Sequence, residues 1–314
     1  MRTAFLAALV LASAMLAQGC TRTSQLEFPV VQKYTARAGD LFYFRPGDSR
    51  FVLIERRDAI AVAIAPVPNV QAYAHDTRIA VGRPQGGGVE IRSFVEGIRP
   101  QQALAITPDG RMLAGGDEYG YLTLWDLETG DTWRSWKEPA PILAVAFSPD
   151  GGALAIGLEK PPGKSMDTVR IRDLDASAPR RTFGGRDAAA VTWAPDGRML
   201  AAGEGNGTVL VAEILGDSAT RPMQAATAAV TALAFHPAGT YLAAAHADKR
   251  VVLWDVASGK AIFTFDPEVP ADPLFPRGIE RIAFDPGGAR LAVAYADGDF
   301  RIWDTSALAK TARQ

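Results

Sequence analysis

The sequence predicts an all-β fold assembled from a tandem repeat of short antiparallel strands. Two observations predict the repeat: a turn motif that recurs along the chain, and short runs of alternating apolar residues on both sides of each turn. A third is composition, since hydrophobic residues make up 48% of the 314 residues and charged residues 22%, which is typical of a globular protein with a core. A chain of this length can form a single domain when its fold is all-β.

The recurring motif is an aromatic or large apolar residue, then any residue, then usually a proline. We identify seven copies, which begin at Phe44, Tyr73, Ile106, Phe147, Trp193, Phe235 and Phe284. In the last five copies a glycine follows the proline: Gly110, Gly151, Gly197, Gly239 and Gly288. Proline presets φ early in a turn, and glycine adopts the positive φ that closes it. Each motif therefore predicts a hairpin between the first two strands of a unit.

Further strands follow each hairpin. In one unit, the run from Val230 to Phe235 precedes the turn, the run from Val251 to Trp254 is a third strand, and the run from Ala261 to Phe265 is a fourth. Four short antiparallel strands form one blade of a β-propeller. We therefore expect a single β-propeller over residues 28–306, with seven blades of four antiparallel strands and a tail at 307–314.

The two ends of the propeller are expected to meet. The segment from Phe28 to Tyr34 is strand-like but has no unit of its own, and the last unit ends after its third strand at Trp303. A closed ring removes exposed sheet edges, which are prone to pair with other chains. The N-terminal segment therefore is predicted to complete the last blade.

The third strands end with a recurring Trp-Asp pair, at Trp125–Asp126, Trp254–Asp255 and Trp303–Asp304. Together with the turn motif, these pairs resemble WD40 repeats over about residues 40–306. The family places an aspartate in the turn before the tryptophan; Asp248 and Asp297 match this position, whereas Tyr119 departs from it, and no Gly-His pair occurs. The resemblance implies a rigid platform whose interblade connections and second turns share one rim.

Residues 1–19 are predicted to be a signal peptide, with Arg2 ahead of an apolar run from Ala4 to Met15. The run ends at Leu16-Ala17-Gln18-Gly19-Cys20, which resembles the lipobox of bacterial lipoproteins. The resemblance implies cleavage before Cys20, the only cysteine, and acylation of its thiol, with 20–27 as a linker. The alternative is an ordinary secretory signal. Thr21 in place of an aspartate resembles lipoproteins of the outer membrane, which implies a periplasm-facing protein that contacts the membrane through its lipid only.

Several functions are disfavoured by the sequence. A net charge of -2 and a pI near 6.0 argue against nucleic-acid binding. The Gly163-Lys164-Ser165 segment lacks the spacing of a phosphate-binding loop, and no Gly-x-Ser-x-Gly motif occurs. His75, His236 and His246 are expected to be solvated turn residues that do not converge on a metal. We therefore expect no catalytic residue, metal or cofactor.

The favoured function is a non-catalytic scaffold that binds another protein or peptide at one rim. Two insertions are expected there, from Glu159 to Asp167 and from Pro267 to Arg277. Leu274 and Phe275, in the second, are either a partner contact or a cap on the adjacent blade. One alternative is a lactonase-like hydrolase, which would need carboxylates in the axial channel, where the first strands carry mostly alanine, valine and isoleucine. Another is envelope assembly, by analogy with other lipoprotein propellers.

Overall fold

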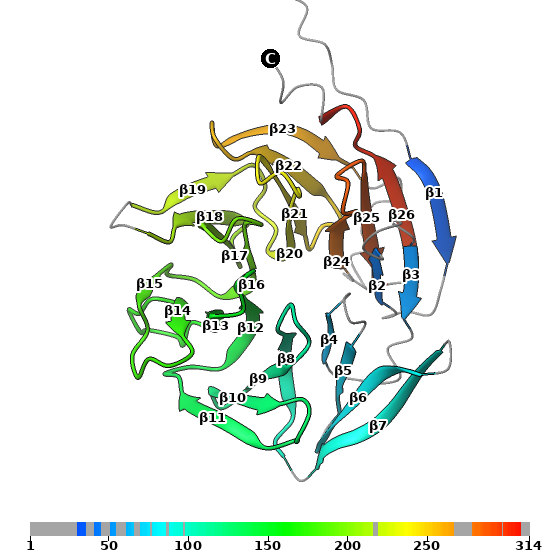
Figure 1. Ribbon diagram of the computed structural model, residues 1–314. Coiled ribbons are helices and arrows are strands. Elements are labelled where there is room, and N and C mark those ends of the chain that lie inside the picture. Colours follow the sequence, from blue (N-terminus) through cyan, green and yellow to red (C-terminus); the bar gives the residue numbers. More distant parts are fainter. Residues whose placement is uncertain are drawn as a thin grey trace, which may run out of the picture.

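The computed structural model describes residues 30–35, 41–44, 51–54, 61–65, 70–75, 77–85, 88–96, 98–215, 219–266, 278–296 and 298–308. Within these residues the strands form six four-stranded sheets and one two-stranded sheet, all of them antiparallel. The sheets surround a central axis, as the blades of a propeller do (Figure 1). The all-β prediction is confirmed. The count of seven four-stranded blades stays a prediction, because one sheet has only two described strands.

The two-stranded sheet consists of β2 (Leu41–Phe44) and β3 (Phe51–Ile54). The next sheets along the chain are β4 (Ala61–Ala65), β5 (Val70–Ala74), β6 (Arg78–Gln85) and β7 (Gly88–Glu96); then β8 (Gln101–Ile106), β9 (Met112–Asp117), β10 (Tyr121–Asp126) and β11 (Thr132–Lys137); then β12 (Ile142–Phe147), β13 (Ala153–Leu158), β14 (Val169–Asp173) and β15 (Arg181–Phe183). They are followed by β16 (Ala188–Trp193), β17 (Met199–Glu204), β18 (Thr208–Glu213) and β19 (Arg221–Gln224); and by β20 (Val230–Phe235), β21 (Tyr241–His246), β22 (Val251–Asp255) and β23 (Lys260–Phe265).

The last sheet joins the two ends of the chain. Its strands are β24 (Ile279–Phe284), β25 (Arg290–Tyr295), β26 (Asp299–Asp304) and, at the outer edge, β1 (Val30–Thr35). β1 runs antiparallel to β26, with Val30 opposite Trp303 and Thr35 opposite Asp299 (Figure 1). The predicted closure by the N-terminal segment is confirmed.

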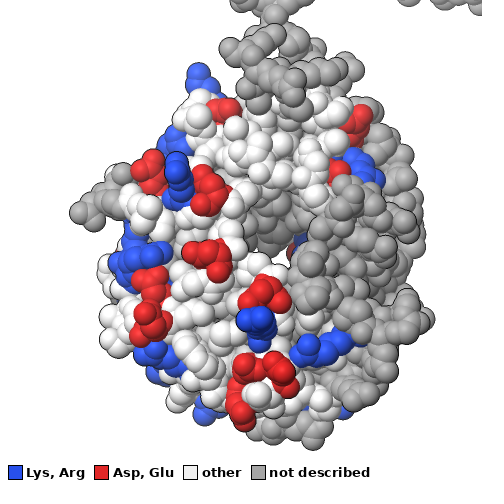
Figure 2. Space-filling model, in the orientation of Figure 1, with Lys and Arg blue, Asp and Glu red and all other residues white. Residues whose placement is uncertain are grey.

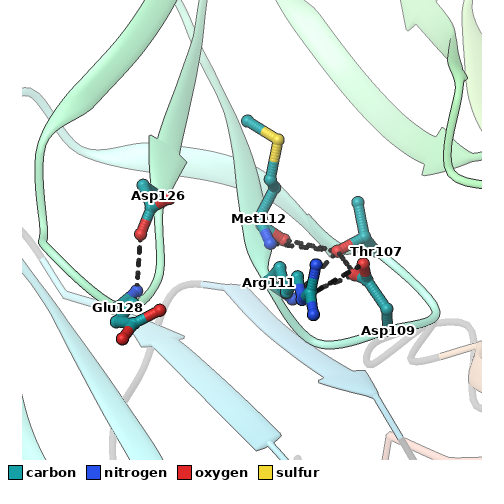
Figure 3. Close-up of polar contacts among 6 residues, drawn as sticks. All are labelled: Thr107, Asp109, Arg111, Met112, Asp126 and Glu128. Carbon is teal, nitrogen blue, oxygen red and sulfur yellow. Dashed lines mark hydrogen bonds and ion pairs between the residues drawn. The ribbon is translucent and has the colours of Figure 1, made fainter.

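The turn motif lies between the first and second strands of its sheet in the five copies that carry the glycine. Their glycines have φ values of 70° to 74°, as the motif predicts. In the first of these turns, the Thr107 hydroxyl donates to Asp109 at 2.6 Å and accepts from the Met112 amide at 3.0 Å (Figure 3). The hydrogen bond from Thr107 is the main cause that lowers the pKa of Asp109. The ionised carboxylate thus stabilises the turn.

The turn predicted at Tyr73 is wrong. Tyr73 lies on β5, the second strand of its sheet, and the first turn of that sheet lies between Ala65 and Val70. The physical reason is that Tyr73-Ala74-His75 contains neither the proline nor the glycine that determines the hairpin. An aromatic residue without these turn residues can lie at the buried end of any strand, so it does not identify the first turn.

Neighbouring sheets pack through apolar side chains and are also joined by arginines. Buried clusters extend from one sheet to the next; for example, Val251 and Leu253 share a cluster with Ile282 and Leu291. Among the described residues, four arginines donate hydrogen bonds to backbone carbonyls at the end of the third strand of the next sheet. We call them the arginine latches: Arg83 to Leu127, Arg134 to Leu174, Arg181 to Glu213, and Arg221 to Val256 and Ala257.

Some predictions concern residues outside this description. They are the signal peptide at 1–19, Cys20 and its linker to residue 27, the pair Leu274 and Phe275, and the last residues of the tail. These predictions stay untested by the structure. Within the described ranges, no helix has the length and apolar character needed to span a bilayer.

Candidate partner-binding site

One sheet carries most of the large apolar side chains that are exposed in the described part of the chain. Tyr119 is 57% exposed, Tyr121 37% and Trp133 49%, and all three belong to the sheet β8–β11. Tyr119 and Tyr121 are at the turn between β9 and β10, whereas Trp133 lies near the start of β11, at the opposite end of that sheet. The two tyrosines therefore form a separate feature.

Asp117 determines the shape of the tyrosine turn. Its side chain is buried, and its Oδ1 atom accepts hydrogen bonds from the amides of Tyr119 at 2.9 Å and Tyr121 at 2.8 Å. Gly120 has a φ of 84°, which favours glycine, and closes the turn with a bond to the Asp117 carbonyl at 3.1 Å. Asp117 thus stabilises the turn from its first residue. The side chain at position 119 is not needed for that role, and the tyrosine there is exposed.

Two cations lie on the tyrosine rings. The guanidinium of Arg99, from the connection between β7 and β8, is 4.4 Å from the centre of the Tyr121 ring and 5.3 Å from that of Tyr119. The ammonium of Lys137, at the end of β11, is 4.4 Å from the centre of the Tyr121 ring and also donates to the Tyr119 carbonyl. We call Arg99, Tyr119, Tyr121 and Lys137 the tyrosine patch. Such cation–π contacts orient the rings and cations toward each other.

The patch rests on a rigid base. The amide of Glu138 donates to the Gly120 carbonyl at 2.7 Å, and a Cβ atom on Gly120 would lie 2.5 Å from the Ala140 carbonyl oxygen. The tyrosine turn is therefore packed directly on the connection between β11 and β12. That connection is fixed in turn, because the buried Glu138 carboxylate pairs with Arg172 at 2.7 Å and with Arg170 at 3.4 Å.

The chemistry of the patch suits protein recognition. Tyrosine and arginine are the residue types that dominate binding energy at protein interfaces, along with tryptophan. Tyr119 also has its pKa raised, first by a hydrogen bond with Glu118 and then by the charge of Glu118. The Tyr119 hydroxyl is thus protonated and engaged by Glu118, and the ring is what the turn presents to a partner.

The predicted insertion from Glu159 to Asp167 is a connection between β13 and β14 that reaches the next sheet. The Lys160 amide donates to Asp187 at 2.7 Å, and Asp187 precedes β16 of that sheet. The Thr182 hydroxyl donates to Asp167 at 2.5 Å, which ties the other end of the insertion to β15. These contacts hold the insertion against the ring, and it carries none of the exposed large apolar side chains of the described residues.

Two of the three histidines are not solvated, which corrects the prediction. His236 is 6% exposed and His246 is fully buried, whereas His75 is half-buried. His236 packs edge-on against Phe284 and forms a hydrogen bond with the Gly288 carbonyl of the next sheet, because its turn lies against that sheet. The Nδ1 atom of His246 forms a hydrogen bond with the Ala228 carbonyl at 2.9 Å. Within the described residues, no three histidine, cysteine, aspartate or glutamate side chains are grouped so as to hold a metal.

The tyrosine patch was missed at the level of sequence, although one signal pointed to it. Tyr119 stands where two other units have Asp248 and Asp297, and a tyrosine in a tight turn is unusual for a purely structural position. Arg99 and Lys137 gave no signal, because only the fold brings them to the turn.

Comparisons with known proteins agree with the repeat pattern. The family described as "WD domain, G-beta repeat" matches residues 177–211, 219–255 and 276–304. The first two matches begin ahead of the outer strands β15 and β19 and end in the third strands, β18 and β22, of the next sheets. One sequence repeat therefore spans two neighbouring sheets, which links each sheet covalently to the next.

Several curated proteins are similar to parts of the chain. The WD repeat-containing protein SL1-17 of Schistosoma mansoni is 29% identical over 158 residues, which cover 50% of this chain and 51% of that protein. Eukaryotic translation initiation factor 3 subunit I of Lodderomyces elongisporus is 24% identical over 189 residues, 54% of each chain. The small ribosomal subunit protein RACK1y of Oryza sativa subsp. japonica is 28% identical over 137 residues, 40% of this chain and 39% of that protein. The chain thus spans about half the length, or less, of these relatives. Between residues 177 and 304, the chain carries WD40 repeats.

Proposed function

We propose that this protein is a non-catalytic scaffold that binds another protein or a peptide through the tyrosine patch. One observation carries the proposal: two exposed tyrosines are held in a rigid turn between an arginine and a lysine. A rigid presentation lowers the entropy lost on binding, and clustered tyrosine and arginine side chains are typical hot-spot residues. The WD40 repeats support the same function, since a ring of repeats offers a broad rim for contacts.

Leu274 and Phe275 are proposed as a second part of this contact surface. They belong to the connection between β23 and β24, and Arg99 belongs to the corresponding connection between β7 and β8. In a ring of repeats, corresponding connections lie on the same rim. An apolar pair on that rim would extend the area that a partner covers.

The proposed setting is the periplasmic face of the outer membrane, with acylated Cys20 as the anchor. The support is the sequence alone: an apolar run and a lipobox-like segment precede the only cysteine. Fractionation of cells that express Cys20→Ser tests the anchor. We expect the variant to leave the membrane fraction, and a variant that pellets with membranes as the wild type does would contradict the proposal.

The axial channel favours a scaffold over a lactonase-like hydrolase. Only one carboxylate, that of Glu280, is found among the described residues that line the channel. Divalent metals that act in hydrolysis are held by several oxygen or nitrogen ligands. A role in envelope assembly is one function that such a scaffold could serve. The identity of the bound partner would show whether it does.

The binding proposal is tested with matched alanine variants. Tyr119→Ala combined with Tyr121→Ala removes both rings of the patch, whereas Trp133→Ala removes an equally exposed ring from the opposite end of the same sheet. After chemical crosslinking in the native envelope, we expect the double variant to lose the co-purified partner and Trp133→Ala to retain it. Equal recovery of the partner from the double variant and the wild type would contradict the proposal.

A further inference from the structure

The axial channel is a cavity of about 510 Å³ at the centre of the ring. Its described lining comes from the first strands β4, β8, β12, β16, β20 and β24 and consists mainly of alanine, valine, leucine and isoleucine. The face drawn in Figure 2 is hollowed where these strands converge. Cavities of this size hold small molecules when a few polar groups are placed among apolar walls.

The first strands share one feature that defines equivalent positions around the channel. In five of the described sheets, the pairing of the first and second strands shifts by one residue near the start of the first strand. The residues immediately after this shift are Ala103, Ala144, Ala190, Ala232 and Arg281. The fold therefore uses alanine at this position in four sheets and places an arginine in the fifth.

Arg281 lines the channel and forms no ion pair with a described residue. Its Nε atom is buried with no hydrogen bond, and within the described residues the guanidinium has neither a hydrogen bond nor an ion pair. Burial alone lowers the pKa of Arg281. Arg281 is half-buried, with its Nε atom shielded from solvent, and a partly desolvated cation is costly when no described group pairs with it. A strand position that tolerates alanine has no structural need of that cation. Among the described residues, the side chain is therefore available to an anion that enters the channel.

We propose that the axial channel binds a monocarboxylate with an aliphatic body, with its carboxylate on Arg281. A planar guanidinium matches a carboxylate through two parallel hydrogen bonds. Glu280 also lines the channel, and its charge disfavours ligands with two or more negative charges, such as phosphate. The many alanine side chains of the lining are small and leave room for a short aliphatic chain. This site is distinct from the tyrosine patch and does not depend on it.

Calorimetric titration of the purified full-length protein with hexanoate tests the site. Hexanamide is the neutral isostere, and inorganic phosphate is the multiply charged anion. We expect hexanoate to bind at least about tenfold more tightly than hexanamide, as a charge-assisted hydrogen bond implies, and phosphate to bind less tightly than hexanoate. Equal affinities for hexanoate and hexanamide, tighter binding of phosphate, or no binding of hexanoate would each overturn the proposal.

Arg281→Ala is the decisive variant, because it restores the residue found in the other four sheets. We expect it to unfold at the same temperature as the ligand-free wild type, or higher, and to bind hexanoate about tenfold or more weakly. Arg111→Gln, which changes an exposed arginine outside the channel, is the control and should bind as the wild type does. Unchanged binding by Arg281→Ala overturns the proposal, and so does a clear loss of stability, since that would give Arg281 a structural role.

Discussion

His246 illustrates how burial changes the role of a single residue. Its ring is fully buried at the end of β21, and only the Nδ1 atom forms a hydrogen bond, to the Ala228 carbonyl. Burial lowers the pKa of His246, and the Ala228 carbonyl offsets this only in part. His236 is buried at the preceding turn, between β20 and β21, and has its pKa lowered for the same main reason. Both rings are therefore neutral in the folded protein near pH 7.

This burial predicts a loss of stability in acid. A histidine in the unfolded chain has a pKa of about 6.5, so below that pH the unfolded state binds more protons than the folded state does. The stability contributed by neutral His246 is thus present above about pH 6.5 and is lost as the pH falls below it. The measurement is the drop in the thermal midpoint of unfolding when the pH is lowered from 7.5 to 5.5. We expect this drop to be several degrees smaller in His246→Gln than in the wild type. A variant with the full acid loss would contradict this assignment, whatever its stability at pH 7.5.

The tyrosine turn between β9 and β10 is the element that carries the binding proposal, and two glycines of one sheet test how it is built. Gly120 and Gly130 have nearly equal φ values, 84° and 82°. A Cβ atom on Gly130 would meet nothing closer than 3.8 Å, whereas on Gly120 it would lie 2.5 Å from the Ala140 carbonyl oxygen. A comparison of alanine at the two positions therefore distinguishes the cost of a positive φ from the cost of a steric clash.

Alanine at these two positions is expected to have unequal effects. Gly130→Ala should cost about 1–2 kcal/mol of unfolding free energy, from the left-handed backbone alone. Gly120→Ala should cost at least about 1 kcal/mol more, because the turn must also move away from the β11–β12 connection. Denaturant unfolding of both variants measures the difference. Equal costs would show that the tyrosine turn does not rest on that connection.

The elements differ in how far the sequence predicts them. Five hairpins carry their own turn residues, so local chemistry determined them and the prediction was correct. The prediction of a turn at Tyr73 was wrong because that segment lacks the proline and glycine of the motif. The prediction of solvated histidines was wrong because burial by a neighbouring sheet cannot be read from the local sequence. The tyrosine patch depends on Arg99 and Lys137, which lie on different segments and meet only in the folded ring. The arginine latches could not be predicted for the same reason, because each arginine and the carbonyl that it contacts lie on different sheets.

At the scale of the whole molecule, the ring is closed by β1, which comes from the opposite end of the chain to its partner β26. Deletion of Val30–Thr35 removes this strand and exposes the edge of β26. We expect the deletion to cost several kcal/mol of unfolding free energy and to promote association, because a free strand edge pairs with other chains. Unfolding curves and light scattering measure both effects. A deletion variant as stable and monodisperse as the parent would contradict closure by β1.

Charge over the ring is mixed rather than of one sign. On the face drawn in Figure 2, acidic and basic side chains are interspersed over the described sheets. On this face the described residues form no broad basic patch. Among the local features of the described residues, the tyrosine patch is the one that combines exposed aromatic rings with cations.

Site-specific photo-crosslinking in living cells tests this central claim most directly. A photoreactive phenylalanine analogue is placed at position 119 in the patch or at position 133, an exposed aromatic position at the far end of the same sheet. We expect a discrete adduct from position 119, none from position 133, and loss of the adduct when Arg99→Glu is added. No adduct from position 119, or equal adducts from both positions, would contradict the proposal that the tyrosine patch is where this protein meets its partner.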